Sequence, residues 1–134
     1  NIKTRRLKNL CHWLKEQGGL EQLQRQDTAE LRKSLLSVNG IGPETADDIL
    51  LYAFDRPVFV IDAYTRRLFT RLGCIHGNEH YETLQELFEQ SLSADTALYN
   101  EYHALIVRHA KEPCAAKPGT GDCRHCIVER PLQD

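Results

Sequence analysis

The chain has 134 residues, of which 41% are hydrophobic and 27% are charged, and its formal net charge is -2. This composition is typical of one soluble domain or part of one, and the charge indicates that any binding to nucleic acid must come from local features. No apolar run approaches the roughly 18 residues that span a bilayer, which excludes a membrane role. Because the chain starts at Asn1 and has no methionine, we expect it to be a portion or a processed product of a longer protein.

Two amphipathic helices are predicted before Gly40. The first should end at Gly18-Gly19, and its apolar residues recur at i, i+3, i+4 and i+7, namely at Leu7, Leu10, Cys11 and Leu14. The second should begin after Asp27, which can cap the helix while Glu30 completes a capping box. The apolar face of this second helix would consist of Leu31, Leu35 and Val38.

A corner that contains Gly40 and Gly42 separates the second helix from a third. Pro43 suits the first position of that third helix, and apolar spacing continues from there to the break at Asp55-Arg56-Pro57. The exposed face of the third helix should carry an acidic patch, formed by Glu44, Asp47 and Asp48.

The next segment, residues 58-61, is continuously apolar and reads "VFVI". The chain offers no second convincing strand to pair with it, so we expect a buried extended connector. Asp62 should then begin a helix that closes at Gly73. Two further helices are predicted, one over residues 81-92 and one whose apolar face consists of Tyr102, Leu105, Ile106 and His109. The predicted architecture is therefore all-α, with short connections.

The glycine corner has the features of a small anion site. A Gly-apolar-Gly turn exposes backbone N-H groups, and the helix that begins at Pro43 adds the positive end of its dipole. Glycine has no Cβ to block a phosphate oxygen, while Ile41 can anchor the turn by packing inward. The alternative is that Gly40 only ends one helix and Gly42 only forms a tight turn.

Three stretches together resemble a known family: "VNGIGPETA" at 38-46, "VFVIDAYTRRLF" at 58-69 and "YHALIVRHAKEPC" at 102-114. The first matches a helix-hairpin-helix pattern, and all three resemble the helix-hairpin-helix DNA glycosylases related to endonuclease III. The pattern is more similar to the 3-methyladenine glycosylase branch than to the branch that removes oxidised pyrimidines. The resemblance covers roughly residues 1-126.

The resemblance implies the C-terminal portion of the helix-hairpin-helix glycosylase fold. Residues 1-54 would be part of the helical barrel domain, with the helix-hairpin-helix at about 36-54. Residues 55-113 would form a helical domain with the catalytic aspartate, and residues 114-134 a cysteine-rich cluster loop.

The implied activity is base-excision repair on double-stranded DNA that contains damaged bases. The matching aspartate is Asp62, which could stabilise positive charge on the sugar or deprotonate the attacking water; the alternative is that Asp62 only caps its helix. The residues expected to contact DNA are Asn39, Gly40, Ile41, Gly42, Thr45 and Arg66. Arg66 and its neighbour Arg67 could instead be ordinary surface or packing residues.

Bifunctional members of the family carry a lysine that attacks the sugar and forms a Schiff base. Glu44 stands at that position here, and no lysine occurs between Lys33 and Lys111. The resemblance therefore predicts a monofunctional enzyme that uses water, and an alkylated base as its substrate. A bifunctional glycosylase/lyase and a non-catalytic DNA-binding module remain the alternatives.

Three cysteines near the end of the chain, Cys114, Cys123 and Cys126, resemble the [4Fe-4S] cluster loop of endonuclease III. The fourth cysteine of that pattern would fall at Leu132, so the fourth ligand is missing from the chain. Zinc held with His125 or His109, or free thiols without metal, are the alternatives. The chain has five cysteines, and an odd count with one cluster favours a metal site in a reducing cytoplasm over a disulfide framework. We expect a monomer.

Overall fold

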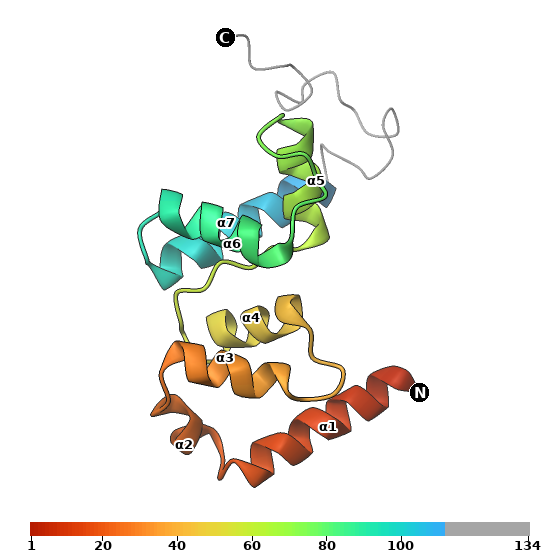
Figure 1. The fold of residues 1–134 in the computed structure, drawn as a ribbon, viewed down its shortest axis with the longest axis vertical. Coiled ribbons are helices and arrows are strands. Elements are labelled where there is room, and N and C mark those ends of the chain that lie inside the picture. The colour runs from red at the N-terminus through yellow and green to blue at the C-terminus, as the bar shows by residue number, and fades with distance from the viewer. Residues whose placement is uncertain (112–134) are drawn as a thin grey trace. The chain divides into compact units, whose positions relative to one another are not determined.

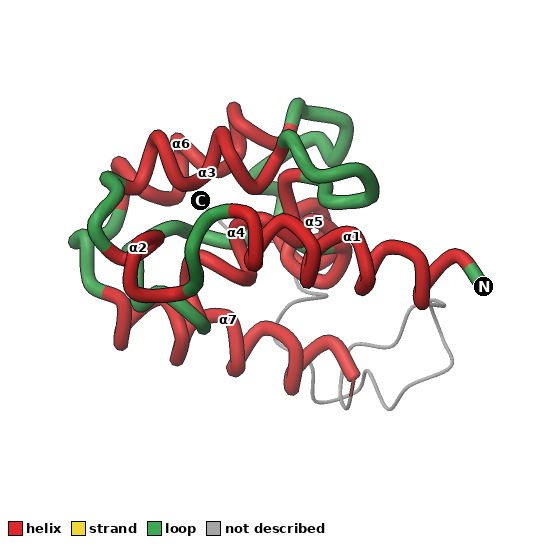
Figure 2. Tube along the Cα trace, turned by 90° about the horizontal axis from the view of Figure 1, so that it is seen from below, coloured by secondary structure: helices red, strands yellow, loops and turns green. Residues whose placement is uncertain are grey.

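The computed structural model describes residues 1-111 and contains only helices and loops in that range (Figure 1; Figure 2). The predicted all-α class is thus confirmed for the described residues. The chain divides into two compact units, and the division falls between Val58 and Phe59, inside the apolar connector.

None of the helices in residues 1-111 is both long enough and apolar enough to cross a membrane.

The first unit contains four helices: α1 (Ile2–Glu16), α2 (Leu20–Gln24), α3 (Thr28–Leu36) and α4 (Pro43–Tyr52). The predicted cap at Asp27 is confirmed, because its side chain accepts a 2.8 Å hydrogen bond from the Glu30 N-H. Pro43 stands at the start of α4, also as predicted. The short helix α2 was not predicted, since Leu23 is its only buried apolar residue.

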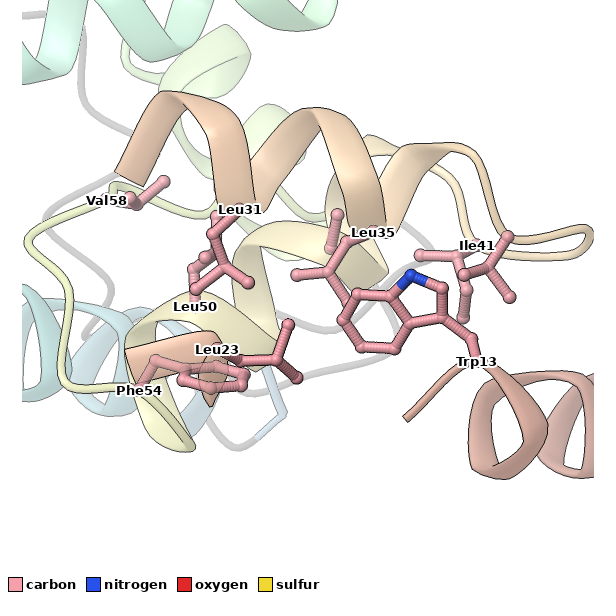
Figure 3. Close-up of a cluster of buried hydrophobic side chains, with 10 residues drawn as sticks. Trp13, Leu23, Leu31, Leu35, Ile41, Leu50, Phe54 and Val58 are labelled. Carbon is pink, nitrogen blue, oxygen red and sulfur yellow. The ribbon is translucent and has the colours of Figure 1, made fainter. Parts of the chain in front are cut away.

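The core of this unit forms between α3, α4, the C-terminal half of α1 and Leu23 of α2, and Trp13 belongs to it (Figure 3). The indole Nε1 of Trp13 donates to the Ser34 hydroxyl at 3.1 Å. The apolar face predicted for α1 is wrong in part, because Cys11 is exposed and Leu7 is 61% exposed. The N-terminal half of α1 extends past α3 and α4 (Figure 1; Figure 2), so only its second half contributes to the core.

A buried ion pair joins the two helices that flank the glycine corner. Arg32 on α3 donates from Nε and Nη2 to the two carboxylate oxygens of Asp47 on α4, at 2.8 and 3.1 Å. The side chain of Asp47 is fully buried. The predicted acidic patch is therefore wrong for Asp47, which lies on the inner face of α4 beside Ala46 and is neutralised by Arg32.

The second unit begins with the connector and contains α5 (Ala63–Arg71), α6 (Tyr81–Ser91) and α7 (Thr96–Lys111). Its core centres on Phe59, whose ring stacks on Phe88 of α6 at 4.5 Å between centroids and meets the edge of Tyr99 of α7 at 5.5 Å. The apolar face predicted for α7 is wrong at Leu105, which is 55% exposed. The buried residues of α7 are instead Tyr99, Ile106 and Ala110.

Replacing Asp47 with alanine should destabilise the protein by roughly 3 to 5 kcal/mol, because the guanidinium of Arg32 would lose its buried counter-charge. Chemical denaturation would measure this change, with Glu101→Ala on the exposed surface as a control that should change stability by less than about 0.5 kcal/mol. The double variant Arg32→Met, Asp47→Leu should recover most of the loss. Equal stability of Asp47→Ala and the parent would contradict a structural role for the pair.

Candidate active site

Three side chains of α6 hold the backbone of the apolar connector. The Phe59 N-H donates to the Glu89 carboxylate at 3.0 Å, and the Phe59 carbonyl accepts from the Gln85 amide at 2.9 Å. The Ile61 N-H donates to the Tyr81 hydroxyl at 3.2 Å. These α6 residues recur every four positions and so share one face of the helix. They satisfy buried backbone groups that a neighbouring strand would otherwise have to pair, which confirms the expected extended connector.

Asp62 follows the connector directly and caps α5. Its Oδ1 accepts a 2.8 Å hydrogen bond from the Thr65 N-H, and its Oδ2 lies 2.8 Å from Nε2 of His103 on α7. The residue is only 8% exposed. The predicted helix cap is thus confirmed, and the same carboxylate makes a second contact that the sequence did not reveal.

Asp62 remains an acid that is ionised near neutral pH despite its burial. Desolvation by burial raises the pKa of this carboxyl group, but hydrogen bonds from His103 and from the Thr65 backbone act against it. The net effect is a pKa below the ordinary value of 3.8. A buried carboxylate held in its charged form can stabilise developing positive charge in a neighbouring group.

His103 is the residue of this site that sequence reasoning missed. It lies between Tyr99 and Ile106 on the buried face of α7, which packs against α5. The sequence did contain a signal, because His103 is a polar residue at a position where helical spacing predicts an apolar one. The signal was missed because the apolar face of α7 was predicted at Tyr102 and Leu105, whereas the buried face contains Tyr99 and Ala110.

The glycine corner belongs to the first unit. Gly40 has a φ of +96°, in the region that only glycine adopts readily, whereas Gly42 has an extended φ of -91°. Ile41 is 9% exposed, so the predicted inward anchor is confirmed, and its N-H donates to the Val38 carbonyl at 3.1 Å. Among the described residues, none accepts a hydrogen bond from the N-H of Gly40 or of Gly42.

The remaining predicted contact residues have different surroundings. Asn39 is exposed, and its carbonyl accepts from the Asn9 amide at 3.1 Å. Thr45 and Glu44 are exposed on the first turn of α4, which no side chain caps. Arg66 belongs to the second unit, where its guanidinium donates to the Gly77 and Glu79 carbonyls at 3.3 and 2.6 Å and so braces the loop after α5.

Arg67, like Arg66, has a structural contact. Its guanidinium donates to the Ala110 carbonyl of α7 at 3.0 Å and lies 5.4 Å from the centre of the Tyr64 ring. Lys111 lies 5.8 Å from the same ring. Tyr64 therefore stands between cations from α5 and α7, an arrangement that favours packing of the two helices.

The proposed metal ligands Cys114, Cys123 and Cys126 lie outside the described residues, as does His125. Within residues 1-111, no group of three His, Cys, Asp or Glu side chains could hold a metal ion. His109, the other histidine considered for zinc, is half-buried on α7. The [4Fe-4S], zinc and metal-free alternatives all stay predictions, and none of the chemistry below depends on a metal.

Comparison with known proteins finds relatives that carry the names of DNA repair enzymes, although no family model matches the chain. A protein of Methanocaldococcus jannaschii that carries the name of a DNA repair glycosylase is 48% identical over 126 residues, which are 92% of this chain and 57% of that protein. Endonuclease III of Sulfolobus acidocaldarius is 30% identical over 128 residues, 96% of this chain and 54% of that enzyme. The chain is thus homologous to proteins that carry the names DNA repair glycosylase and endonuclease III.

The fold is similar to that of a solved DNA glycosylase. The crystal structure of the H. pylori 3-methyladenine DNA glycosylase MagIII, bound to 1,N6-ethenoadenine, superposes with a TM-score of 0.69 and 32% identity. The match covers 82% of this chain and 56% of MagIII. The chain thus spans little more than half the length of the relatives that it matches.

The stability of the protein should depend on the ionisation of Asp62. Because the pKa of Asp62 is lower in the folded than in the unfolded chain, its carboxylate stabilises the fold above its ordinary pKa, and this stabilisation is lost as the pH falls through the folded-state pKa. Asp62→Asn should lower the free energy of unfolding by roughly 1 to 3 kcal/mol at pH 7. Urea denaturation from pH 7 to pH 3 should show the two proteins converging; a constant difference would contradict the lowered pKa.

Proposed function

We propose that this chain is the catalytic portion of a monofunctional DNA glycosylase that hydrolyses the bond between an alkylated base and deoxyribose. The observation that carries the proposal is Asp62, a carboxylate that is 8% exposed and yet held in its ionised form by two hydrogen bonds. Homology to DNA repair glycosylases supplies the reaction class. Double-stranded DNA with a damaged base is the proposed substrate.

The chemistry requires little more than such a carboxylate. As the C1′-N bond breaks, its electron pair leaves with the base and positive charge develops on the sugar. The oxygen of a water molecule bonds to C1′, and the proton that this water loses can pass to Asp62. Each carboxylate oxygen has two acceptor positions, so both oxygens of Asp62 can accept a further bond beside those from Thr65 and His103.

Two observations favour an alkylated base. An alkylated purine such as 3-methyladenine carries positive charge before the reaction, so it leaves without protonation by an acid. The site described above offers a carboxylate that stays ionised and so cannot act as that acid. MagIII, whose structure resembles this chain, is itself a 3-methyladenine DNA glycosylase.

The monofunctional mechanism rests on Glu44, at the position of the lysine that forms a Schiff base in bifunctional relatives. Glu44 is exposed on the first turn of α4, and a carboxylate cannot form an imine. No lysine occurs between Lys33 and Lys111. Water is therefore the proposed nucleophile.

The glycine corner is the proposed grip on the DNA backbone. The N-H groups of Gly40 and Gly42 have no acceptor among the described residues, and they lie next to the uncapped start of α4. Backbone amides at a helix N-terminus bind phosphate without reading sequence. Asn39 and Thr45, both exposed, flank these amides.

Asp62→Asn should reduce the release of methylated bases from alkylated duplex DNA by at least about 100-fold in the full-length protein. Asparagine can still cap α5, so the loss should come from the missing charge. Asp95→Asn is a matched control, because Asp95 also caps a backbone N-H, that of Leu98, but is exposed. Base release by Asp62→Asn at the parental rate would refute the catalytic role. A covalent adduct with DNA trapped by borohydride would instead indicate a lyase.

Gly42→Ala should weaken binding to duplex DNA by roughly tenfold, equivalent to about 1.4 kcal/mol, because a methyl group would obstruct the phosphate. It should leave stability unchanged, since φ is negative and a Cβ at this position meets nothing within 4 Å. Gly40→Ala should instead lower stability by roughly 1 to 2 kcal/mol, because its φ is +96°. Fluorescence anisotropy and thermal unfolding would measure the two effects. Parental DNA affinity in Gly42→Ala would argue against phosphate binding here.

A further inference from the structure

We propose that His103 is a positioning residue for Asp62, and that its Nε2-H fixes the orientation of the carboxylate for the excision reaction. This inference rests on the proposed function. The observation behind it is the 2.8 Å contact between Nε2 of His103 and Oδ2 of Asp62, which joins α7 to the start of α5. The side chains of the two residues are 17% and 10% exposed.

The direction of this hydrogen bond follows from the charge of Asp62. An ionised carboxylate can only accept hydrogen bonds, so the proton in the contact belongs to Nε2 of His103. The Thr65 N-H already fixes Oδ1 at 2.8 Å. Oδ1 is thus bound to α5 and Oδ2 to α7. The carboxylate therefore cannot rotate about its Cβ-Cγ bond without breaking a contact.

Three other charged groups of the second unit form hydrogen bonds with the backbone. On α5, Arg66 binds the Gly77 and Glu79 carbonyls and Arg67 binds the Ala110 carbonyl. On α6, Glu89 accepts from the Phe59 N-H. Among the described side chains, His103 has the largest effect in lowering the pKa of Asp62, and it acts mainly through its hydrogen bond.

This arrangement matters for catalysis in two ways. A carboxylate that must face developing positive charge or accept a proton from water loses efficiency when it is misplaced by even about 1 Å, at a cost of up to roughly 100-fold in rate. A carboxylate that becomes protonated loses its charge altogether. The Nε2-H donor counters both losses, because it restrains the position of Oδ2 and favours the ionised form.

The first experiment needs no catalysis. Carboxyl ¹³C NMR would follow the titration of Asp62 in the full-length protein, in His103→Ala and in His103→Gln. The midpoint should move to higher pH in His103→Ala and return toward the parental value in His103→Gln, because the glutamine amide can donate a neutral hydrogen bond. The same midpoint in the parent and in His103→Ala would overturn the inference, whatever the activity of the protein.

The second experiment measures single-turnover base release on alkylated duplex DNA as a function of pH. His103→Ala should be slower by roughly 10- to 100-fold, with its acid limb shifted to higher pH, while DNA affinity stays within about twofold of the parent. His103→Gln should recover most of the rate. His80→Ala, which removes an exposed imidazole from the same unit, should behave like the parent.

The outcomes separate the inference from the proposed function. An active parent whose His103→Ala variant keeps the parental rate and acid limb would overturn the role of His103 alone. A rate loss in His103→Ala with an unshifted acid limb, a lower melting temperature and no recovery in His103→Gln would indicate a merely structural residue and would also overturn it. A parent that releases no base, and is unaffected by Asp62→Asn, would overturn the proposed function and with it the role in excision.

Discussion

The hydrogen bonds from α6 to the extended connector determine where the catalytic candidate lies. Tyr81, Gln85 and Glu89 together satisfy three backbone groups of residues 59-61. Each such bond contributes only about 1 kcal/mol net, but leaving a buried backbone group unpaired costs about 1 to 3 kcal/mol. The chain can therefore run extended through the core without a partner strand. It emerges at Asp62 with the backbone geometry that a helix cap requires.

The two buried carboxylates of the described residues, Asp47 and Asp62, differ in their surroundings. Asp47 receives a bidentate contact from Arg32, and arginine stays charged at any physiological pH, so the pair is a permanent link between α3 and α4. Asp62 receives two single hydrogen bonds, one from a backbone amide and one from a histidine. Of the two, only Asp62 is placed at the start of a helix, where a carboxylate keeps acceptor capacity for a substrate or water.

The two glycines of the corner differ in whether the fold requires them. Gly40 supplies a left-handed backbone conformation that other residues adopt only with strain. Gly42 has an ordinary extended conformation with open space around its Cα hydrogens, so the fold itself would accept a side chain there. A glycine that the fold does not require is better explained by something outside the chain that must approach the backbone closely, and a phosphate oxygen meets that description.

Much of the local structure could be predicted from the sequence. The caps at Asp27 and Asp62, the corner at Gly40 to Gly42 and the start of α4 at Pro43 all appeared as expected. These features depend on backbone conformation and on hydrogen bonds between residues a few positions apart, which a sequence states directly. Asp62 was found in the same way, as a helix cap within a recognisable family pattern.

The tertiary structure alone decided which polar side chains meet. His103 contacts Asp62 across 41 positions of sequence, and Asp47 turned inward to Arg32 although it was expected at the surface. The sequence determined that helices form at α1, α4 and α5 and roughly where they end. It did not determine which face of each helix turns inward, because core packing sets the orientation of a helix about its own axis. That orientation decides which residues face the site.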